Sequence, residues 1–334
     1  FSMSDKILIL GGNGTIGESV TRQLVNRGED VTLLLRPDRK PMHPVKVVTG
    51  DGNDEPALAA LQQREKFDIV INLLIYTPEQ AEMNLRVFRD VKQLIFISTV
   101  CVHDREQAVV FNEESVCGNR FSSYGQNKRL AEQVFLRAAE QDGFPVTIVR
   151  PTQTYGGKKL PLSVKGGSYW GICQRILDGK PVIVHGDGSS TWVSTYCDDL
   201  AAGIMLLVGN DAAVGQIWQI TSDEVLSWDQ MYRILGEELG REPKIVHIPT
   251  DILVKIGMDS GLRGDKEASV IFDNAKIKKL GFAPQVSFRE GVRKYLAGVE
   301  KHPEWKTVDP AFDERCDAVC AAWERMAENF NSTI

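Results

Sequence analysis

Residues 6–17 read Lys-Ile-Leu-Ile-Leu-Gly-Gly-Asn-Gly-Thr-Ile-Gly, a short apolar run followed by closely spaced glycines. The apolar run predicts a buried parallel strand, and apolar residues at helical spacing in Glu18–Asn26 predict a helix directly after the turn. Gly12, Gly14 and Gly17 match the G-x-G-x-x-G pattern, in which glycines bring the backbone and a helix N-terminus against a pyrophosphate. This unit therefore predicts a dinucleotide-binding fold.

Strand-like and helix-like segments alternate along the first half of the chain. We expect further strands at 30–35, 45–48, 68–74, 94–98 and 146–150, and a long helix at 123–140. This alternation predicts an α/β fold with a doubly wound parallel (Rossmann) sheet and a smaller α+β lobe toward the C-terminal side. The expected parts are a Rossmann domain at 3–155, its sheet completed by segments near 182–220, a substrate-binding lobe at 156–300 and an amphipathic helix at 301–334.

The composition excludes several classes of protein. The 334 residues carry a formal net charge of −6, which argues against nucleic acid or an anionic membrane as the partner. No apolar run reaches the roughly 18 residues that span a bilayer. The six cysteines show neither metal-ligand spacing nor the density of a disulfide framework. We therefore expect a reduced, cytoplasmic protein without a metal site, acting on a small molecule.

The end of the second strand indicates which dinucleotide is bound. In this fold the residue about twenty positions after the glycines meets the adenosine ribose, and an acidic residue there favours NAD. This chain has Arg36 there, followed by Arg39 and Lys40. Guanidinium and ammonium groups suit a 2′-phosphate, so the predicted cofactor is NADP, with NAD still possible. The alternative is that this basic turn is only a solvated surface loop.

Other cofactor contacts follow from the expected topology. An acid just past the third strand is placed to accept a hydrogen bond from the adenine amino group, and the tip of the fourth strand passes near the nicotinamide ribose. The residues predicted to contact the cofactor are Gly11, Gly14, Thr15, Ile16, Gly17, Arg36, Asp51, Gly52, Leu73, Leu74, Tyr124, Lys128 and Pro151.

Tyr124 and Lys128 lie four residues apart at the start of the long helix, so they share one face. A tyrosine titrates near pH 10, so its use as a base near neutrality requires its pKa to fall by roughly three units. The ammonium of Lys128 and an oxidised nicotinamide are charges able to cause that fall. The fifth strand ends in Ser98-Thr99, which supplies a hydroxyl to hold a substrate oxygen.

With these motifs the chain resembles the extended short-chain dehydrogenase/reductase family, of the NAD(P)-dependent epimerase/dehydratase type that includes sugar-nucleotide epimerases. The resemblance also rests on residues 50–54, 96–103, 150–156, 186–190, 198–201 and 280–284. It implies that Thr99, Tyr124 and Lys128 are catalytic and that hydride moves to or from C4 of a nicotinamide. It further implies a sugar-type substrate and a homodimer formed through a four-helix bundle that includes the Tyr124 helix.

Departures from the family pattern bear on the reaction. Sugar 4,6-dehydratases have Asp-Glu where this chain has Val100 and Cys101, so that reaction is not expected. Nucleotide-sugar epimerases have Asn at Gln153, and an Arg that grips the diphosphate at Trp192. Loss of this Arg removes a charge-assisted contact of roughly 1.5–3 kcal/mol, which puts a nucleotide-sugar substrate in doubt. Trp192 either stacks on a ring of the substrate or is simply a core residue.

Cys101 occupies the position of the acid/base cysteine of GDP-sugar 3,5-epimerases. Those enzymes pair it with a His or Lys just past a Tyr-Gly turn, and here Lys158 and Lys159 follow Tyr155-Gly-Gly. Cys101 is therefore a fourth candidate catalytic residue, and the alternative is a small packing residue at a strand end. The predicted substrate contacts are Gln153, Tyr155, Lys158 and Trp192.

Three functions remain open from the sequence. The leading hypothesis is an NAD(P)-dependent epimerase or reductase of a sugar or sugar-nucleotide-type substrate. A second is an NADPH-dependent reductase of a phenolic or terpenoid carbonyl, with Tyr155, Trp170 and Trp192 lining an aromatic pocket. A third is a non-catalytic NAD(P)- or RNA-binding protein on the same fold, against which the retained Tyr124 and Lys128 argue.

Overall fold

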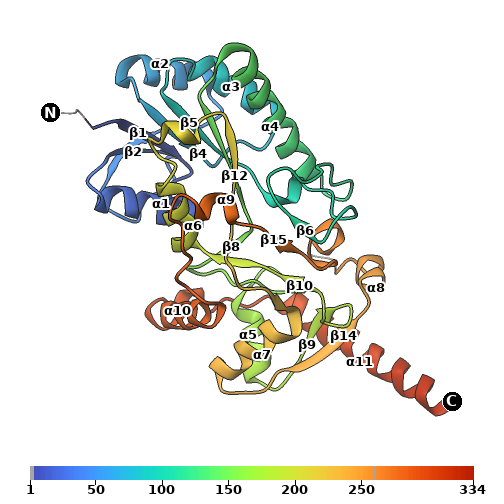
Figure 1. Ribbon diagram of the computed structural model, residues 1–334. Helices are drawn as coiled ribbons and strands as arrows, with labels where there is room; N and C mark the ends of the chain where they lie inside the picture. Colours follow the sequence, from blue (N-terminus) through green and yellow to red (C-terminus); the bar gives the residue numbers. More distant parts are fainter. Residues whose placement is uncertain (1–3, 259–260) are drawn as a thin grey trace. The chain divides into compact units, whose positions relative to one another are not determined.

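The computed structural model describes residues 4–258 and 261–334 and divides the chain into two compact units (Figure 1). The first unit comprises Phe1–Thr154, Thr195–Asp223 and Phe272–Gln285. The second unit comprises Tyr155–Ser194, Glu224–Ile271 and Val286–Ile334.

A parallel seven-stranded sheet, in the order β12-β7-β5-β4-β1-β2-β3, forms the centre of the first unit. Its strands are β1 (Lys6–Leu10), β2 (Asp30–Leu35), β3 (Lys46–Thr49), β4 (Ile69–Asn72), β5 (Gln93–Ile97), β7 (Val146–Pro151) and β12 (Gln216–Ile220). The strand order reverses between β1 and β4, which is the switch point at which ligands bind in open α/β sheets. The predicted doubly wound α/β fold is confirmed.

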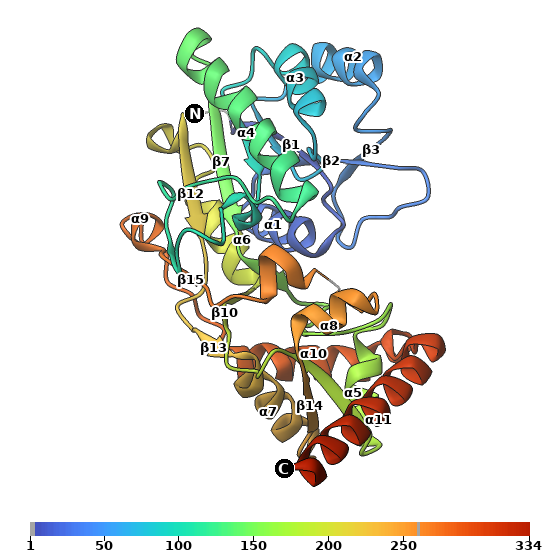
Figure 2. The same ribbon diagram turned by 90° about the vertical axis from the view of Figure 1, so that its right-hand side faces the viewer.

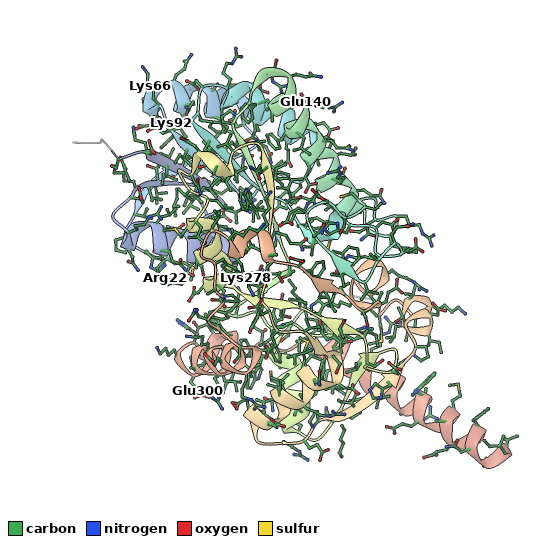
Figure 3. The ribbon with its side chains drawn as sticks, in the orientation of Figure 1. Arg22, Lys66, Lys92, Glu140, Lys278 and Glu300 are labelled. Carbon is green, nitrogen blue, oxygen red and sulfur yellow. The ribbon has the colours of Figure 1, made fainter. Side chains whose placement is uncertain are left out.

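Side chains of β1 alternate between the two faces of the sheet and take part in two separate cores. Leu8 and Leu10 pack with the helices of one face, and Ile7 and Ile9 with those of the other. The first face carries α2 (Glu55–Glu65), α3 (Pro78–Val87) and α4 (Ser123–Asp142), and the second carries α1 (Thr15–Asn26), α6 (Cys197–Met205) and α9 (Ala275–Lys278) (Figure 2). Charged side chains such as Lys66, Lys92 and Glu140 point outward (Figure 3).

The described residues of the second unit form short strands and five α-helices, besides two short helices of other types. Its strands include β9 (Pro181–His185) paired with β14 (Lys244–Ile248), and β10 (Thr191–Trp192) paired with β13 (Leu226–Ser227). Its helices are α5 (Trp170–Leu177), α7 (Trp228–Leu239), α8 (Thr250–Lys255), α10 (Phe288–Lys301) and α11 (Pro310–Thr333). The remaining elements of the chain are η1 (Val100–Val102), β6 (Val110–Phe111), β8 (Gln153–Tyr155), β11 (Ser194–Tyr196), η2 (Asp211–Ala213), η3 (Leu262–Lys266), β15 (Ile271–Phe272) and η4 (Pro303–Trp305).

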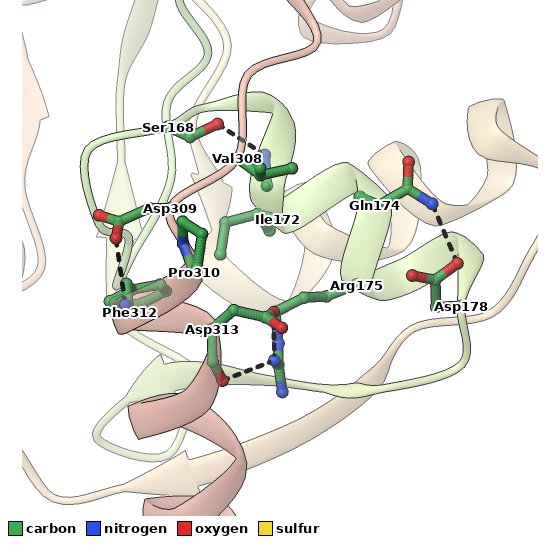
Figure 4. Close-up of a pocket in the computed structure, with 11 residues that line it drawn as sticks. Ser168, Ile172, Gln174, Arg175, Asp178, Val308, Asp309, Pro310, Phe312 and Asp313 are labelled. Carbon is green, nitrogen blue, oxygen red and sulfur yellow. Dashed lines mark hydrogen bonds and ion pairs between the residues drawn. The ribbon is translucent and has the colours of Figure 1, made fainter.

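A buried arginine ties α11 to α5 within the second unit. The guanidinium of Arg175 lies 2.6 Å from a carboxylate oxygen of Asp313 (Figure 4). It also lies 2.7 Å from a carboxylate oxygen of Asp317. Beside this contact lies a pocket of about 260 Å³ between α5 and the start of α11. The first half of α11 is thereby held against the unit, whereas Met326 and Phe330 farther along the predicted apolar stripe are exposed.

The division of the chain differs from the predicted domains in two respects. Only β12 of the region near 182–220 completes the central sheet, because β9 pairs with β14 instead. Residues 301–334 fall inside the second unit, and the segment 272–285, predicted for the substrate lobe, falls inside the first, together with the segment 195–223 that contains β12. Strand-like periodicity shows that a segment is extended but does not identify its partner.

A buried ion pair joins α4 to β7 in the first unit. The guanidinium of Arg150 donates to both carboxylate oxygens of Glu132, at 2.8 and 2.7 Å, and both side chains are fully buried. Ser98 and Arg129 also donate to this carboxylate. Burial, the largest single influence, would raise the pKa of Glu132, but the hydrogen bonds and charge of Arg150, together with the hydrogen bonds from Ser98 and Arg129, outweigh it and hold that pKa below its usual value.

We predict that Glu132→Gln lowers the free energy of unfolding by about 3–5 kcal/mol, because it leaves Arg150 buried without its counter-charge. Urea denaturation measures this loss. The double variant Glu132→Gln/Arg150→Met removes both charges and is expected to lose clearly less than Glu132→Gln alone. Equal losses in the single and double variants would contradict the assignment of an energetically coupled pair.

Candidate active site

The glycine turn leaves the N-terminus of α1 open toward the carboxyl end of the sheet. Gly11 has φ +88°, a left-handed conformation that glycine adopts without strain. A Cβ on Gly17 would lie 2.0 Å from the carbonyl oxygen of Gly11, so only glycine lets the helix pack this closely on the turn. Gly14 is the N-cap of α1, and no side chain caps its first N–H groups. These N–H groups suit a pyrophosphate.

A pocket of about 420 Å³ lies beside this turn, at the switch point of the sheet. Six of the predicted cofactor contacts line it, namely Gly11, Gly14, Arg36, Asp51, Gly52 and Leu74. Arg39 also lines it. The pocket further includes residues that were not predicted to contact the cofactor: Asn13, Gly50 and Asn53 are variable or unassigned positions inside the quoted motifs, and Leu34, Leu35, Tyr76 and Gln80 belong to strand ends and loops without a motif.

The basic end of β2 forms one wall of this pocket. The N–H of Arg39 donates to the carbonyl of Arg36 at 3.0 Å in a tight turn, and both residues, which are exposed, line the pocket. Arg39 also pairs loosely with Asp38, at 3.8 Å. Across the pocket, one carboxylate oxygen of Asp51 accepts the N–H of Asn53. The pocket is therefore lined by two cationic residues, Arg36 and Arg39, and by the carboxylate residue Asp51.

The other predicted cofactor contacts lie around the same edge of the first unit. Thr15 and Ile16 form the first turn of α1, and Leu73 follows β4. A Cβ on Gly11 would lie 3.1 Å from Leu73, so these two segments are in close contact. Pro151 is buried at the carboxyl end of β7 and does not line the pocket.

Lys128 is buried beneath the exposed ring of Tyr124, one turn earlier on α4. The side chain of Lys128 is 2% exposed and that of Tyr124 46%. The Lys128 ammonium donates to the carbonyl of Ile97 at 2.8 Å and lies 5.8 Å from the centre of the Tyr124 ring. Burial lowers the pKa of Lys128 to about 7. The charge of this lysine near neutrality therefore depends on the groups around it.

The short helix η1 brings Thr99 and Cys101 against the first turn of α4. The hydroxyl of Thr99 accepts the N–H of Cys101 at 3.1 Å and caps η1. A Cβ on Gly125 would lie 2.2 Å from the carbonyl oxygen of Cys101, and the amide of Asn119 donates to the same oxygen. The absence of a side chain at Gly125 therefore lets the strand end approach the residue next to Tyr124. The four predicted catalytic residues belong to this one assembly.

Arg105 is a neighbour of this assembly that sequence reasoning missed. Its guanidinium donates to the carbonyl of Val100 at 3.3 Å and lies 4.0 Å from the sulfur of Cys101. A guanidinium beside a thiol favours the thiolate. In the sequence, only the four-residue spacing between Cys101 and Arg105 pointed to this contact. That spacing places two residues on one face only within a helix, and η1 ends at Val102.

The predicted substrate contacts of the second unit need correction. Tyr155 is 1% exposed, with its ring 6.0 Å from that of Phe288, and Trp192 is 4% exposed, with its ring 5.5 Å from that of Trp228. Both pack in the apolar interior of the unit and offer no open ring face to a substrate. Lys158, in contrast, is exposed in a turn.

Two pockets lined by described residues separate the three side chains that were predicted to form an aromatic pocket for a phenolic substrate. Trp170 lines a groove of about 440 Å³, Trp192 borders a cavity of only about 10 Å³, and Tyr155 lines neither of them. Gln153, the remaining predicted substrate contact, is half-buried in β8 of the first unit. The burial of Tyr155 and Trp192 therefore gives no support to the hypothesis of a phenolic or terpenoid reductase.

Comparison with known proteins gives a family match and several relatives. A family model described as "NAD dependent epimerase/dehydratase family" matches residues 7–221. The 2′-dehydrokanamycin reductase of Streptomyces kanamyceticus is 26% identical over 250 residues, 74% of this chain and 70% of that protein. The chloroplast stem-loop binding protein of 41 kDa b of Arabidopsis thaliana is 26% identical over 262 residues, 74% of this chain and 66% of that protein.

Solved structures show the same fold. The UDP-glucose 4-epimerase of Thermotoga maritima, crystallised with UDP-glucose, matches with a TM-score of 0.72 and 22% identity. The match covers 89% of this chain and 99% of that protein.

Among residues 4–258 and 261–334, no helix combines the length and the apolar character needed to cross a membrane.

Proposed function

The chain belongs to the NAD-dependent epimerase/dehydratase family, and we propose that it is an NADP-dependent epimerase or reductase of a sugar or sugar-nucleotide-type substrate. The resemblance inferred from the sequence is thus confirmed at the level of the family. The observation that carries the proposal is the assembly of Thr99, Tyr124 and Lys128 at the carboxyl end of β5, in the same unit as the glycine turn.

Each residue of this assembly has a distinct chemical role in the proposal. The Thr99 hydroxyl accepts a backbone N–H and still has its own proton to donate to the reacting oxygen of the substrate. Tyr124, which is exposed, gives or takes the proton of that oxygen. Lys128, in its ammonium form, would stabilise the tyrosinate and hold the ribose of a bound cofactor. A bound nicotinamide supplies the acceptance and donation of hydride at its C4.

The glycine turn and the pocket beside it fit the dinucleotide. The uncapped N–H groups at the start of α1 would hold the pyrophosphate, and Asp51 would accept from the adenine amino group. Arg36 and Arg39 would bind a 2′-phosphate, which NADP carries and NAD does not. This pair of arginines supports NADP over NAD.

Epimerase and reductase differ in whether the cofactor leaves the enzyme. A reductase exchanges its cofactor after every turnover, whereas an epimerase returns the hydride to the same substrate and retains the cofactor. Mass spectrometry of the cofactor that co-purifies with the protein separates the two. Tightly held oxidised cofactor supports the epimerase, and protein that purifies without cofactor supports the reductase, as the name of the Streptomyces relative also does.

A nucleic-acid-binding role is the second candidate, and the stem-loop binding relative from Arabidopsis is the observation in its favour. The net charge of −6 opposes it, because affinity for nucleic acid comes largely from basic side chains at phosphates. Binding of a stem-loop RNA that is lost as salt is raised, together with no turnover of any sugar substrate, would support it over the enzyme.

Tyr124→Phe is expected to lower turnover by about 10²–10⁴-fold, because it removes the proton that the enzyme transfers. The measurement is NADPH oxidation with a panel of 4-keto sugars and UDP-sugars, and epimerisation of the same panel followed by NMR. Binding of NADPH, followed by its fluorescence, is the control and should change little. Wild-type turnover retained in Tyr124→Phe would overturn the proposed mechanism.

Arg36→Asp is expected to weaken NADP binding and strengthen NAD binding, because a carboxylate repels the 2′-phosphate and accepts from a free 2′-hydroxyl. Isothermal titration gives the two dissociation constants, whose ratio should shift about tenfold or more toward NAD. Arg27→Asp, at the opposite end of α1, makes the same change of charge away from the pocket and should leave the ratio unchanged. An unchanged ratio in Arg36→Asp would show that the cofactor assignment is wrong.

Cys101 is proposed as an acid/base for a proton next to the substrate carbonyl, supported by the nearby guanidinium of Arg105. Cys101→Ala should then abolish deuterium exchange from D₂O into a 4-keto sugar-nucleotide substrate. Hydride transfer to the carbonyl should persist, because it depends on Thr99, Tyr124 and Lys128. If Cys101→Ala exchanges deuterium as fast as the wild type, Cys101 is only a packing residue.

A further inference from the structure

The ammonium of Lys128 is surrounded by aromatic rings. The ring centre of Tyr76 lies 4.7 Å from this nitrogen, that of Phe96 lies 5.1 Å away and that of Tyr124 lies 5.8 Å away. All three distances are within the range of cation–π attraction. Tyr76 is nearest, and it follows β4 rather than belonging to either element of the Tyr-x-x-x-Lys site. Nothing in the sequence pattern of the family motif points to it.

Tyr76 also lines the cofactor pocket, so one side chain faces both the pocket and the lysine. Its position is fixed through Gln80, whose side-chain oxygen accepts the N–H of Tyr76 at 2.6 Å and that of Thr77 at 3.2 Å. Gln80 is itself part of the capping box that begins α3, and its amide donates to Asn53 across the pocket. The backbone of Tyr76 is therefore held by a network, although its side chain is 44% exposed.

We propose that Tyr76 is a positioning residue of the candidate active site, whose ring face keeps the buried Lys128 amine in its charged form and directs it toward the cofactor pocket. The ring does this through its quadrupole, since the negative face of an aromatic ring attracts an ammonium and not a neutral amine. The consequence for catalysis rests on the proposed function, whereas the effect on Lys128 does not.

The other groups that face Lys128 stabilise its ammonium only partly. The carbonyl of Ile97, from β5, accepts one of the three ammonium protons. Glu132, one turn later on α4, is the carboxylate whose charge favours the ammonium, but it is engaged by Arg150 and Arg129. Tyr124 lies farther from the nitrogen than Tyr76 does. Burial therefore opposes the charge of Lys128 with little compensation apart from the rings.

Two variants of Tyr76 distinguish the effect of the ring face on Lys128 from the effects of side-chain size and of the hydroxyl. Tyr76→Phe keeps the ring face and removes only the hydroxyl. Tyr76→Leu keeps an apolar side chain over the lysine, so that water is still excluded, but removes the quadrupole. Tyr76→Met serves as a second ring-free variant if Tyr76→Leu folds poorly, because an unbranched side chain adapts to irregular gaps.

The readout is the titration of Lys128 in the cofactor-free protein, which requires no substrate. Trace acetylation with isotopic acetic anhydride is carried out over a series of pH values, and the peptide that contains Lys128 is quantified by mass spectrometry. Lys276 serves as the internal reference, because its ammonium lies 4.3 Å from the ring centre of Trp218 and donates to the carbonyl of Ile217. That lysine makes the same two kinds of contact in the same unit with a different ring, although it is only partly buried.

The proposal predicts that the pKa of Lys128 falls by about 0.5–1 unit in Tyr76→Leu, remains as in the wild type in Tyr76→Phe, and that Lys276 is unaffected in both. An unchanged Lys128 in Tyr76→Leu, or equal shifts in the Leu and Phe variants, would overturn it. Once a substrate is in hand, the alkaline limb of the pH–rate profile should move to lower pH in Tyr76→Leu only. If Tyr76→Leu lowers the pKa of Lys128 but the wild-type protein turns over no substrate, the proposed function is contradicted and the role of Tyr76 is not.

Discussion

The close approach of α4 to the end of β5 depends on the missing side chain of Gly125. Any larger residue there would collide with the carbonyl oxygen of Cys101, because even a Cβ would lie 2.2 Å from it. This contact fixes η1 beside the first turn of α4, and so it brings the Thr99 hydroxyl, the Cys101 thiol and the Tyr124 ring into one assembly. Effective acid–base catalysis needs such fixed placement, since a displacement of about 1 Å can cost two orders of magnitude in rate.

The electrostatics of the same region follow from burial. Lys128 and Glu132 are both on the inner face of α4, where each charge has lost its water. Glu132 is compensated by Arg150, Arg129 and Ser98, which hold it ionised. Lys128 has a carbonyl and three rings instead, and its pKa falls to about 7. A lysine whose pKa lies near neutrality changes its charge readily when a neighbouring group ionises. A proton-transfer site requires this property.

Much of this arrangement could be predicted from the sequence, and the limits have physical causes. The glycine spacing and the alternating apolar runs are local signals, so they gave the Rossmann sheet, the turn and the Tyr124 helix. Tyr76 and Arg105 act through contacts made by loops, for which the sequence has no periodicity. Tyr155 was wrongly predicted to contact the substrate, and Trp192 could not be assigned to a core or a substrate contact, because large aromatic residues serve equally well in a core and in a binding pocket. Burial, which distinguishes the two, is a property of the whole fold.

The central claim is that Thr99, Tyr124 and Lys128 converge on a carbon–oxygen bond beside C4 of a bound nicotinamide. The most direct test is a crystal structure of the protein with bound NADP and the measurement of the distance from the Tyr124 oxygen to C4. The expected distance is about 4–5 Å, which leaves room for the reacting carbon and oxygen, with the Lys128 amine within hydrogen-bond reach of the ribose. A distance well over about 8 Å, in a closed and fully occupied complex, would contradict the claim.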